Sequence, residues 1–152
     1  EEDIVEWGLS KPLTHFEEEI DFWNWAKDFN GSSIFRNLKT YENAVEVLYE
    51  VSKSGHEVVI ISSKPWWSIH DTLIWLGENK IPSKEIHFLE DKWRIDCDVY
   101  IDDAPHQLKN FVENVPDKLI LRFVRPYNKP VAGTKDLSNW LELNSLLESY
   151  NL

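Results

Sequence analysis

Short polar clusters directly follow two apolar, β-branched runs in this sequence of 152 residues. Ser62 and Ser63 come after residues 58–61, and Asp102 and Asp103 come after a second run. Hydroxyl and backbone N–H groups at a turn from a strand into a helix can hold a phosphate group, aided by the helix dipole. Adjacent carboxylates repel each other unless a cation or hydrogen-bond donors offset their charge, and Mg²⁺ commonly takes one or two carboxylates. The pattern is therefore compatible with phosphate and metal chemistry.

A lysine lies close to these clusters in the sequence. Lys92 precedes Asp102 by ten residues, and a lysine in that place can neutralise the charge of a bound phosphate. Each feature also has a purely structural interpretation. The serines can be N-cap or turn residues, the aspartates can form a turn that Pro105 follows, and Lys92 can be an ordinary surface lysine. The residues by themselves leave both interpretations open.

The elements that must position these residues alternate between strands and helices. Continuous apolar runs predict strands buried on both faces, and apolar residues at helical spacing predict helices between them. Such an alternation is typical of an α/β fold with a parallel sheet, whose functional residues lie beyond the carboxyl ends of the strands. The predicted strands cover residues 58–61, 86–89, 98–101 and 119–124, and the predicted helices include residues 44–51, 69–76, 108–112 and 140–150.

Capping signals predict the ends of the helix that contains residues 44–51. Thr40 is of a residue type that favours the N-cap position. Gly55 follows the last apolar residue of the helical pattern, where a C′ glycine is common. We therefore expect the helix to begin soon after Thr40 and to end just before Gly55.

The segment 1–35 differs from the rest of the chain because it is both acidic and aromatic. The spacing predicts a helix there with one apolar face. The residues of that face are Phe16, Ile20, Trp23 and Ala26.

Composition narrows the class of protein and its partners. The chain has one domain's worth of residues, and its net charge of −11 argues against a nucleic-acid polymer as partner. No apolar run reaches the roughly 18 residues of a membrane span, and we expect no membrane partner. The single cysteine, Cys97, cannot form an internal disulfide and favours the cytoplasm. The histidines show no metal-ligand spacing, and the oligomeric state stays open, a dimer included.

The order of an apolar strand with Ser62, then Lys92, then a strand with the aspartate pair resembles the haloacid-dehalogenase-like phosphatase superfamily. The closer resemblance is to its 5′(3′)-deoxyribonucleotidase branch. It is carried by residues 34–65, 72–92 and 98–111, above all by "RNLKTYENAVEVLYEVSKSGHEV" together with "VYIDDAP". The resemblance implies a Rossmann-like, three-layer parallel sheet in a core of residues 36–152. It also implies that residues 1–35 form the small helical cap of that branch.

The same resemblance implies roles for single residues. The Ser62 hydroxyl would bind the transferring phosphoryl group, with help from the backbone of Ser63. Lys92 would steady the negative charge of the phosphate and of the nucleophile. Asp102 and Asp103 would hold Mg²⁺.

Four aromatic residues fall where cap residues of the branch stack on a nucleobase: Phe22, Trp23, Trp25 and Phe35. The alternative is that these rings pack the cap against the core, because aromatic pairs stabilise each other in that way. Both interpretations stay open at the level of the sequence.

One motif of the superfamily is missing. Its first strand ends in Asp-x-Asp, of which the first aspartate is the nucleophile and the second the general acid and base. Asp96-Cys97-Asp98 precedes a strand instead of following one, so we do not accept it as a substitute. The chain also contains no Met. We expect a further segment of roughly 10–30 residues before Glu1, enough for a strand, a turn and the entry to the cap.

Three functions follow as hypotheses. The first is a Mg²⁺-dependent phosphatase that hydrolyses deoxynucleoside monophosphates through an aspartyl-phosphate, with residues 1–152 inactive by themselves. The second is a non-catalytic binding module that keeps the phosphate and metal pocket or binds a protein partner through its acidic, Trp-rich cap. The third keeps the phosphatase chemistry but takes a sugar phosphate or another small phosphate ester.

Overall fold

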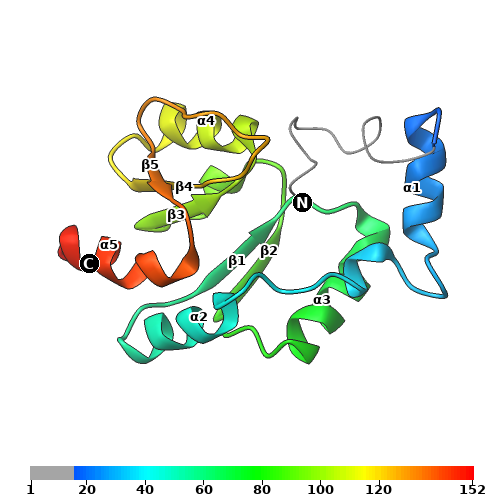
Figure 1. The fold of residues 1–152 in the computed structure, drawn as a ribbon, viewed down its shortest axis with the longest axis horizontal. Helices are drawn as coiled ribbons and strands as arrows, with labels where there is room; N and C mark the ends of the chain where they lie inside the picture. The colour runs from blue at the N-terminus through cyan, green and yellow to red at the C-terminus, as the bar shows by residue number, and fades with distance from the viewer. Residues whose placement is uncertain (1–15) are drawn as a thin grey trace. The chain divides into compact units, whose positions relative to one another are not determined.

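The computed structural model describes residues 16–152, which form two compact units (Figure 1). The N-terminal unit ends at Leu89, and the C-terminal unit contains Glu90–Leu152. The predicted division into a cap of residues 1–35 and a core of residues 36–152 stays a prediction, and the first 15 residues of that cap lie outside the described residues. Each unit is described below by itself.

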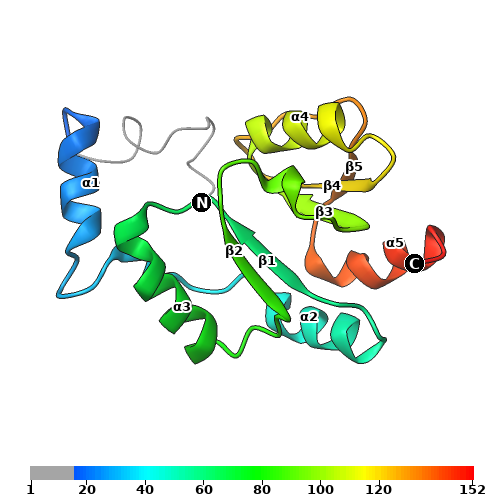
Figure 2. The ribbon, with the colours of Figure 1, turned by 180° about the vertical axis from the view of Figure 1, so that it is seen from behind.

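The N-terminal unit combines three α-helices with a two-stranded parallel sheet. Strands β1 and β2 lie side by side (Figure 2). Their register runs from Val59 opposite Glu85 to Ser62 opposite Phe88. In chain order the elements are α1 (Glu19–Lys27), the 3₁₀ helix η1 (Ile34–Arg36), α2 (Ala44–Lys53), β1 (Val59–Ser62), the 3₁₀ helix η2 (Trp66–Ser68), α3 (Ile69–Glu78) and β2 (Glu85–Phe88).

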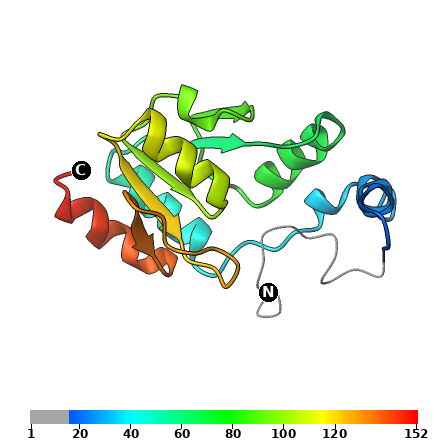
Figure 3. The same cartoon turned by 90° about the horizontal axis from the view of Figure 1, so that it is seen from above.

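The C-terminal unit is a three-layer arrangement around a parallel sheet in the order β3-β4-β5. Helices α4 and α5 lie on opposite sides of these strands (Figure 3). The elements are the 3₁₀ helix η3 (Lys92–Arg94), β3 (Val99–Asp102), α4 (Pro105–Asn114), β4 (Leu119–Phe123), β5 (Lys135–Leu137), the 3₁₀ helix η4 (Trp140–Glu142) and α5 (Leu143–Ser149). Helices and parallel strands in both units confirm the predicted Rossmann-like α/β fold.

The two sheets differ in burial. All five residues of β4 are buried, as the continuous apolar run predicts. All four residues of β1 are only half-buried, so the prediction of burial on both faces is wrong for that strand. Within residues 16–152, β1 pairs with β2 alone, and a strand in a two-stranded sheet keeps more of its surface in water.

One hydrophobic cluster of the C-terminal unit lies between the sheet and α4. Tyr100 and Ile120, neighbours across the β3–β4 register, pack with Leu108 and Phe111 of α4. The Tyr100 and Phe111 ring centroids are 4.5 Å apart. Because side chains alternate between the two faces of a strand, Asp102 and Arg122 share the face of this cluster and lie at its carboxyl end.

Helix α2 ends as predicted but begins later than predicted. Gly55 has φ +100°, and the backbone N–H groups of Gly55 and His56 donate to the carbonyls of Ser52 and Val51. This is a Schellman motif, which confirms the C′ glycine. Thr40 is not the N-cap. Asn43 holds that position in a left-handed conformation, and the chain turns just before α2.

The apolar face of α1 is rotated from the predicted one. Phe22 and Ala26 are its buried residues, whereas Ile20 is 63% exposed. Phe16 precedes the helix, which begins at Glu19. The prediction was wrong because Phe16 packs back on Phe22 from outside the helix, with ring centroids 6.1 Å apart, and so does not extend a helical stripe.

A segment that follows α1 is tied to α3 by two polar contacts. The backbone N–H of Ser33 donates to Asp71 Oδ2 at 2.6 Å, and Trp75 Nε1 donates to the carbonyl of Leu38 at 2.6 Å. The hydrogen bond from Ser33 lowers the pKa of Asp71 below its ordinary value. The charged form of Asp71 therefore stabilises the folded N-terminal unit.

No helix among residues 16–152 is long and apolar enough to cross a membrane.

We expect Asp71→Asn to lower the free energy of unfolding by about 1 kcal/mol at neutral pH, because the charge-assisted bond to Ser33 is weakened. The folded-state pKa of Asp71 is lowered, so its contribution is complete above the ordinary Asp value of about 3.9 and is lost as the pH falls through the lower folded-state value. Urea unfolding at about pH 7 and about pH 3 measures both effects. Asp117→Asn, at an exposed turn, is the control. An equal loss for Asp71→Asn at both pH values would contradict the assignment.

Candidate functional site

An ion pair lies at the carboxyl end of β3. Lys92 Nζ is 2.6 Å from Asp102 Oδ2, and the two side chains are 14% and 6% exposed. The second oxygen, Asp102 Oδ1, accepts a hydrogen bond of 2.8 Å from the backbone N–H of Ala104. Each buried charge is therefore offset by the other, and both carboxylate oxygens have a partner.

The sequence places these groups by simple local features. Asp102 is the last residue of β3, and Pro105 is the first residue of α4, a position where proline needs no N–H partner. The short turn between them turns the Ala104 N–H toward Asp102. On the other side, Gln107 of α4 donates from Nε2 to the carbonyl of Glu90 at 2.9 Å. Helix α4 thus holds the chain on both sides of the ion pair.

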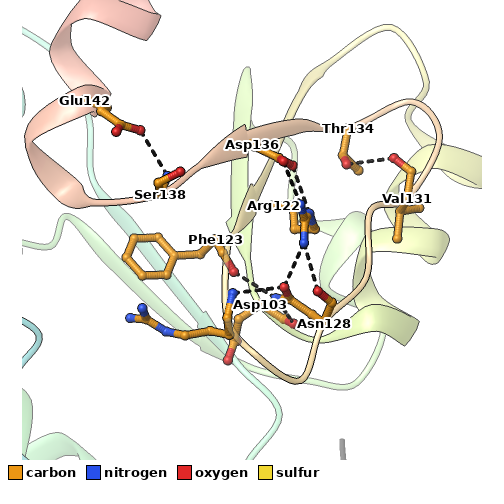
Figure 4. Close-up of polar contacts among 10 residues, drawn as sticks. Asp103, Arg122, Phe123, Asn128, Val131, Thr134, Asp136, Ser138 and Glu142 are labelled. Atoms are coloured by element: carbon orange, nitrogen blue, oxygen red, sulfur yellow. Dashed lines mark hydrogen bonds and ion pairs between the residues drawn. The ribbon is translucent and has the colours of Figure 1, made fainter. Parts of the chain in front are cut away.

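Asp103 is held by a different part of the chain. Its carboxylate oxygen Oδ2 accepts a hydrogen bond from the Tyr127 hydroxyl. Its backbone carbonyl accepts one of 2.8 Å from Asn128 Nδ2 (Figure 4). Asn128 is in turn bound by the buried Arg122 of β4. The sequence reasoning missed these residues. Their signal is weaker than that of the other polar residues, because Tyr127 and Asn128 stand three and four residues after the end of the apolar run 119–124.

The donor set at Asp102 and Asp103 fits one kind of metal site. Within the described part of the chain, no group of three or more His, Cys, Asp or Glu side chains is assembled to hold a metal ion. Mg²⁺ does not need such a group, since it is usually bound by one or two carboxylates and keeps several waters. Two adjacent carboxylates are therefore compatible with magnesium and not with an all-protein cage.

Ser62 and Ser63 lie at the end of β1 in the N-terminal unit. The Ser63 hydroxyl donates to the carbonyl of Leu89 at 3.2 Å, and the Leu89 N–H donates to the carbonyl of Ser62 at 3.2 Å. Neither serine caps α3, whose N-cap residue is Ser68. The strand end therefore positions both serines, and their meeting with Lys92 in one site stays a prediction.

Three of the predicted base-stacking residues, Phe22, Trp23 and Trp25, pack together, whereas Phe35 packs on Trp67. Phe22 lies 5.0 Å from Trp23 and 5.9 Å from Trp25 between ring centroids. Phe35 lies 5.9 Å from Trp67, and Lys64 Nζ lies 3.7 Å from the centroid of the Phe35 ring. These contacts are those of a packing cluster, one of the two interpretations above, and the binding of a nucleobase stays a prediction.

The sequence also matches a protein family over residues 1–150. The family is described as "5' nucleotidase, deoxy (Pyrimidine), cytosolic type C protein". The chain belongs to this family. Membership confirms the resemblance to the deoxyribonucleotidase branch and agrees with the Rossmann-like fold of both units.

Three relatives are similar to the chain at low identity. A protein of Oceanobacillus iheyensis named as a putative nucleotidase is 26% identical over 115 residues, which cover 70% of the chain and 60% of the relative. A "Putative nucleotidase" of Bacillus cereus is 26% identical over 149 residues, 87% of the chain and 71% of the relative. A "Putative 5'(3')-deoxyribonucleotidase" of Chlorobaculum tepidum is 22% identical over 111 residues, 69% of the chain and 52% of the relative. The chain thus spans between about half and seven-tenths of the length of these relatives.

We expect Lys92→Met to lower the free energy of unfolding by about 3 kcal/mol, because Asp102 would then be a buried charge without its partner. The double variant Lys92→Met/Asp102→Leu should recover part of the loss, since it leaves neither charge buried. Chemical unfolding of the purified variants measures this.

Lys118→Met is the matched control within the same unit. Lys118 pairs with Asp96 and Asp98, whose side chains are 89% and 82% exposed, so its replacement should cost much less stability than that of Lys92. Equal losses for Lys92→Met and Lys118→Met would show that the Lys92–Asp102 pair is not the buried interaction described here.

Proposed function

We propose that the protein that contains this chain is a Mg²⁺-dependent phosphatase of deoxynucleoside monophosphates that works in the cytoplasm. The observation that carries the proposal is the buried Lys92–Asp102 pair with Asp103 beside it, at the end of a parallel strand. The family match over residues 1–150 also supports the proposal. A site with a fixed ammonium group and two carboxylates suits phosphoryl transfer, where positioning and charge stabilisation supply most of the catalysis.

Lys92 is the proposed phosphate-binding cation. An ammonium group has three N–H donors, and the contact with Asp102 uses one of them. The remaining donors can bind phosphoryl oxygens, and the positive charge stabilises the negative charge that builds up during transfer. In the proposed site Ser62 would add its hydroxyl as a further donor, and Ser63 its backbone N–H.

Asp102 and Asp103 are the proposed magnesium ligands. A bound magnesium ion would supply positive charge that offsets the charge of the phosphoryl group. Each carboxylate oxygen has two lone pairs, so the existing bonds of Asp102 with Lys92 and Ala104 are compatible with a further bond to a metal. The two residues would meet the ion with hard oxygen donors, as magnesium prefers.

The nucleophile of the proposed reaction lies outside the residues that carry the site. A carboxylate oxygen would attack phosphorus, and the bond from phosphorus to the nucleoside oxygen would break as that oxygen takes a proton from a second carboxyl group. Water would then attack the phosphorus of the aspartyl-phosphate and give its proton to the second carboxylate, releasing inorganic phosphate and restoring both carboxyl groups. Lys92 would hold the phosphoryl oxygens through both steps.

The proposed substrate is a nucleoside monophosphate because the family description and the names of the relatives point to nucleotides. In this proposal the rings of Phe22, Trp23, Trp25 and Phe35 bind the base. A sugar phosphate is the alternative that keeps the same chemistry.

The test is phosphate release from dUMP and dTMP in the presence of Mg²⁺. The assay compares residues 1–152 with the protein translated from the whole gene, and it includes Lys92→Met of each. We expect the whole-gene protein to be active, Lys92→Met to lower kcat/KM by at least about 100-fold, and residues 1–152 to be inactive. Activity of residues 1–152 would contradict the proposed place of the nucleophile.

A substrate panel separates the remaining alternatives. Higher kcat/KM for glucose 6-phosphate or another sugar phosphate than for dUMP would overturn the nucleotide assignment while keeping the phosphatase. Binding of dUMP with Mg²⁺ but without turnover, measured by calorimetry on the whole-gene protein, would instead indicate a non-catalytic binding module.

A further inference from the structure

The connection between β4 and β5 is held by polar side chains instead of a helix. Parallel strands are usually joined by a helical crossover, but residues 124–134 contain none. Backbone carbonyls in such a segment need partners wherever water cannot reach them. Asn128, which is 5% exposed, lies at the centre of the connection, and its side chain bonds to backbone groups of Phe123, Arg125 and Asp103.

The side chain of Asn128 uses both its donor and its acceptor groups twice. Its Nδ2 donates at 2.8 Å to the carbonyl of Asp103 and at 2.8 Å to the carbonyl of Phe123. Its Oδ1 accepts from the backbone N–H of Arg125 at 3.0 Å and from Arg122 Nη1 at 3.0 Å. An amide side chain has two donor hydrogens and two acceptor lone pairs, so its hydrogen-bonding capacity is filled and its orientation is set.

Arg122 anchors this arrangement from β4. It is 4% exposed, and its charge is offset by Asp136 of β5 through bonds of 2.9 Å from Nε and 2.6 Å from Nη2 (Figure 4). Its Nη1 also donates to the backbone carbonyl of Asn128 at 2.9 Å. Charge-assisted and bidentate bonds of this kind are the strong ones. Asn128 therefore cannot turn without breaking bonds to a buried guanidinium group.

Two residues of this connection bond to Asp103, one to its backbone carbonyl and one to its side chain. Asn128 holds its backbone carbonyl, and the hydroxyl of the adjacent Tyr127 donates to its carboxylate oxygen Oδ2. The two contacts come from consecutive residues, so the position of Tyr127 follows from that of Asn128. The carboxylate of Asp103 is thereby directed by a residue far away in the sequence.

We propose that Tyr127 is a positioning residue for the Asp103 carboxylate as a metal ligand, kept in place by Asn128 and Arg122. This inference deepens the proposed function and rests on the metal site in it. Hydrogen bonds from outside the ligand shell orient ligating groups, and their loss typically weakens metal binding about 10- to 100-fold. The bonds between Arg122 and Asn128 fix the β4–β5 connection, and the connection in turn orients the Asp103 carboxylate through Tyr127.

The experiment measures Mn²⁺ affinity, because Mn²⁺ takes oxygen ligands similar to those of Mg²⁺ and free Mn²⁺ is counted by electron paramagnetic resonance. Wild type, Tyr127→Phe, Asn128→Ala and Asp103→Asn are titrated, and the thermal unfolding of each is recorded. Tyr100→Phe is the matched control. The Tyr100 hydroxyl donates to the carbonyl of Ile95 at 2.7 Å in the same unit, so the control also loses a tyrosine hydrogen bond.

We expect Tyr127→Phe and Asn128→Ala to weaken Mn²⁺ binding at least about tenfold, while Tyr100→Phe lowers the unfolding temperature and leaves the Mn²⁺ affinity unchanged. Wild-type affinity in Tyr127→Phe would overturn the inference but keep the metal site. Equal weakening in Tyr100→Phe would overturn it too, because the effect would then follow stability alone. If Asp103→Asn binds Mn²⁺ as wild type does, the metal site itself fails, and the proposed function loses its metal assignment with it.

Discussion

The C-terminal unit depends on the burial of one positive charge. The Arg122 guanidinium group lies at the end of β4, almost fully removed from water, and a charge there is costly unless it is paired and its N–H groups are bonded. Asp136 supplies the opposite charge from β5, and Asn128, in the connection between the strands, accepts two further hydrogen bonds from Arg122 Nη1. One requirement thus joins β4, β5 and the irregular segment between them, and it reaches Asp103 through Asn128.

The same constraint organises the candidate site. Lys92 and Asp102 are both mostly buried, and each offsets the charge of the other. The Ala104 N–H completes the partners of the carboxylate. Because these groups are already oriented, a phosphate bound as proposed would meet a cation that needs little rearrangement. Preorganised charge of this kind is the main source of stabilisation in reactions that transfer charged groups.

Much of the fold could be predicted because its signals are local. The apolar runs that became β3 and β4 and the C′ glycine Gly55 each depend on a few neighbouring residues. Strand β5 was missed because its sequence, Lys135–Leu137, has two charged residues and no apolar run. The apolar face of α1 was misplaced because Phe16 contacts Phe22 from outside the helix. Helical periodicity assumes that all the residues compared belong to one helix, so it does not detect such a contact.

The sequence by itself determined that polar residues follow the strands, that two carboxylates are adjacent, and that the chain resembles nucleotidases. It could not determine which groups complete each carboxylate. Tyr127 is 24 residues from Asp103, and Asp136 is 14 residues from Arg122. Such partners meet only because parallel strands bring their carboxyl ends to one edge and because the β4–β5 connection folds over that edge. Tertiary structure therefore decided how the Asp103 carboxylate is held, since the energy of a buried polar group depends on partners that no local pattern specifies.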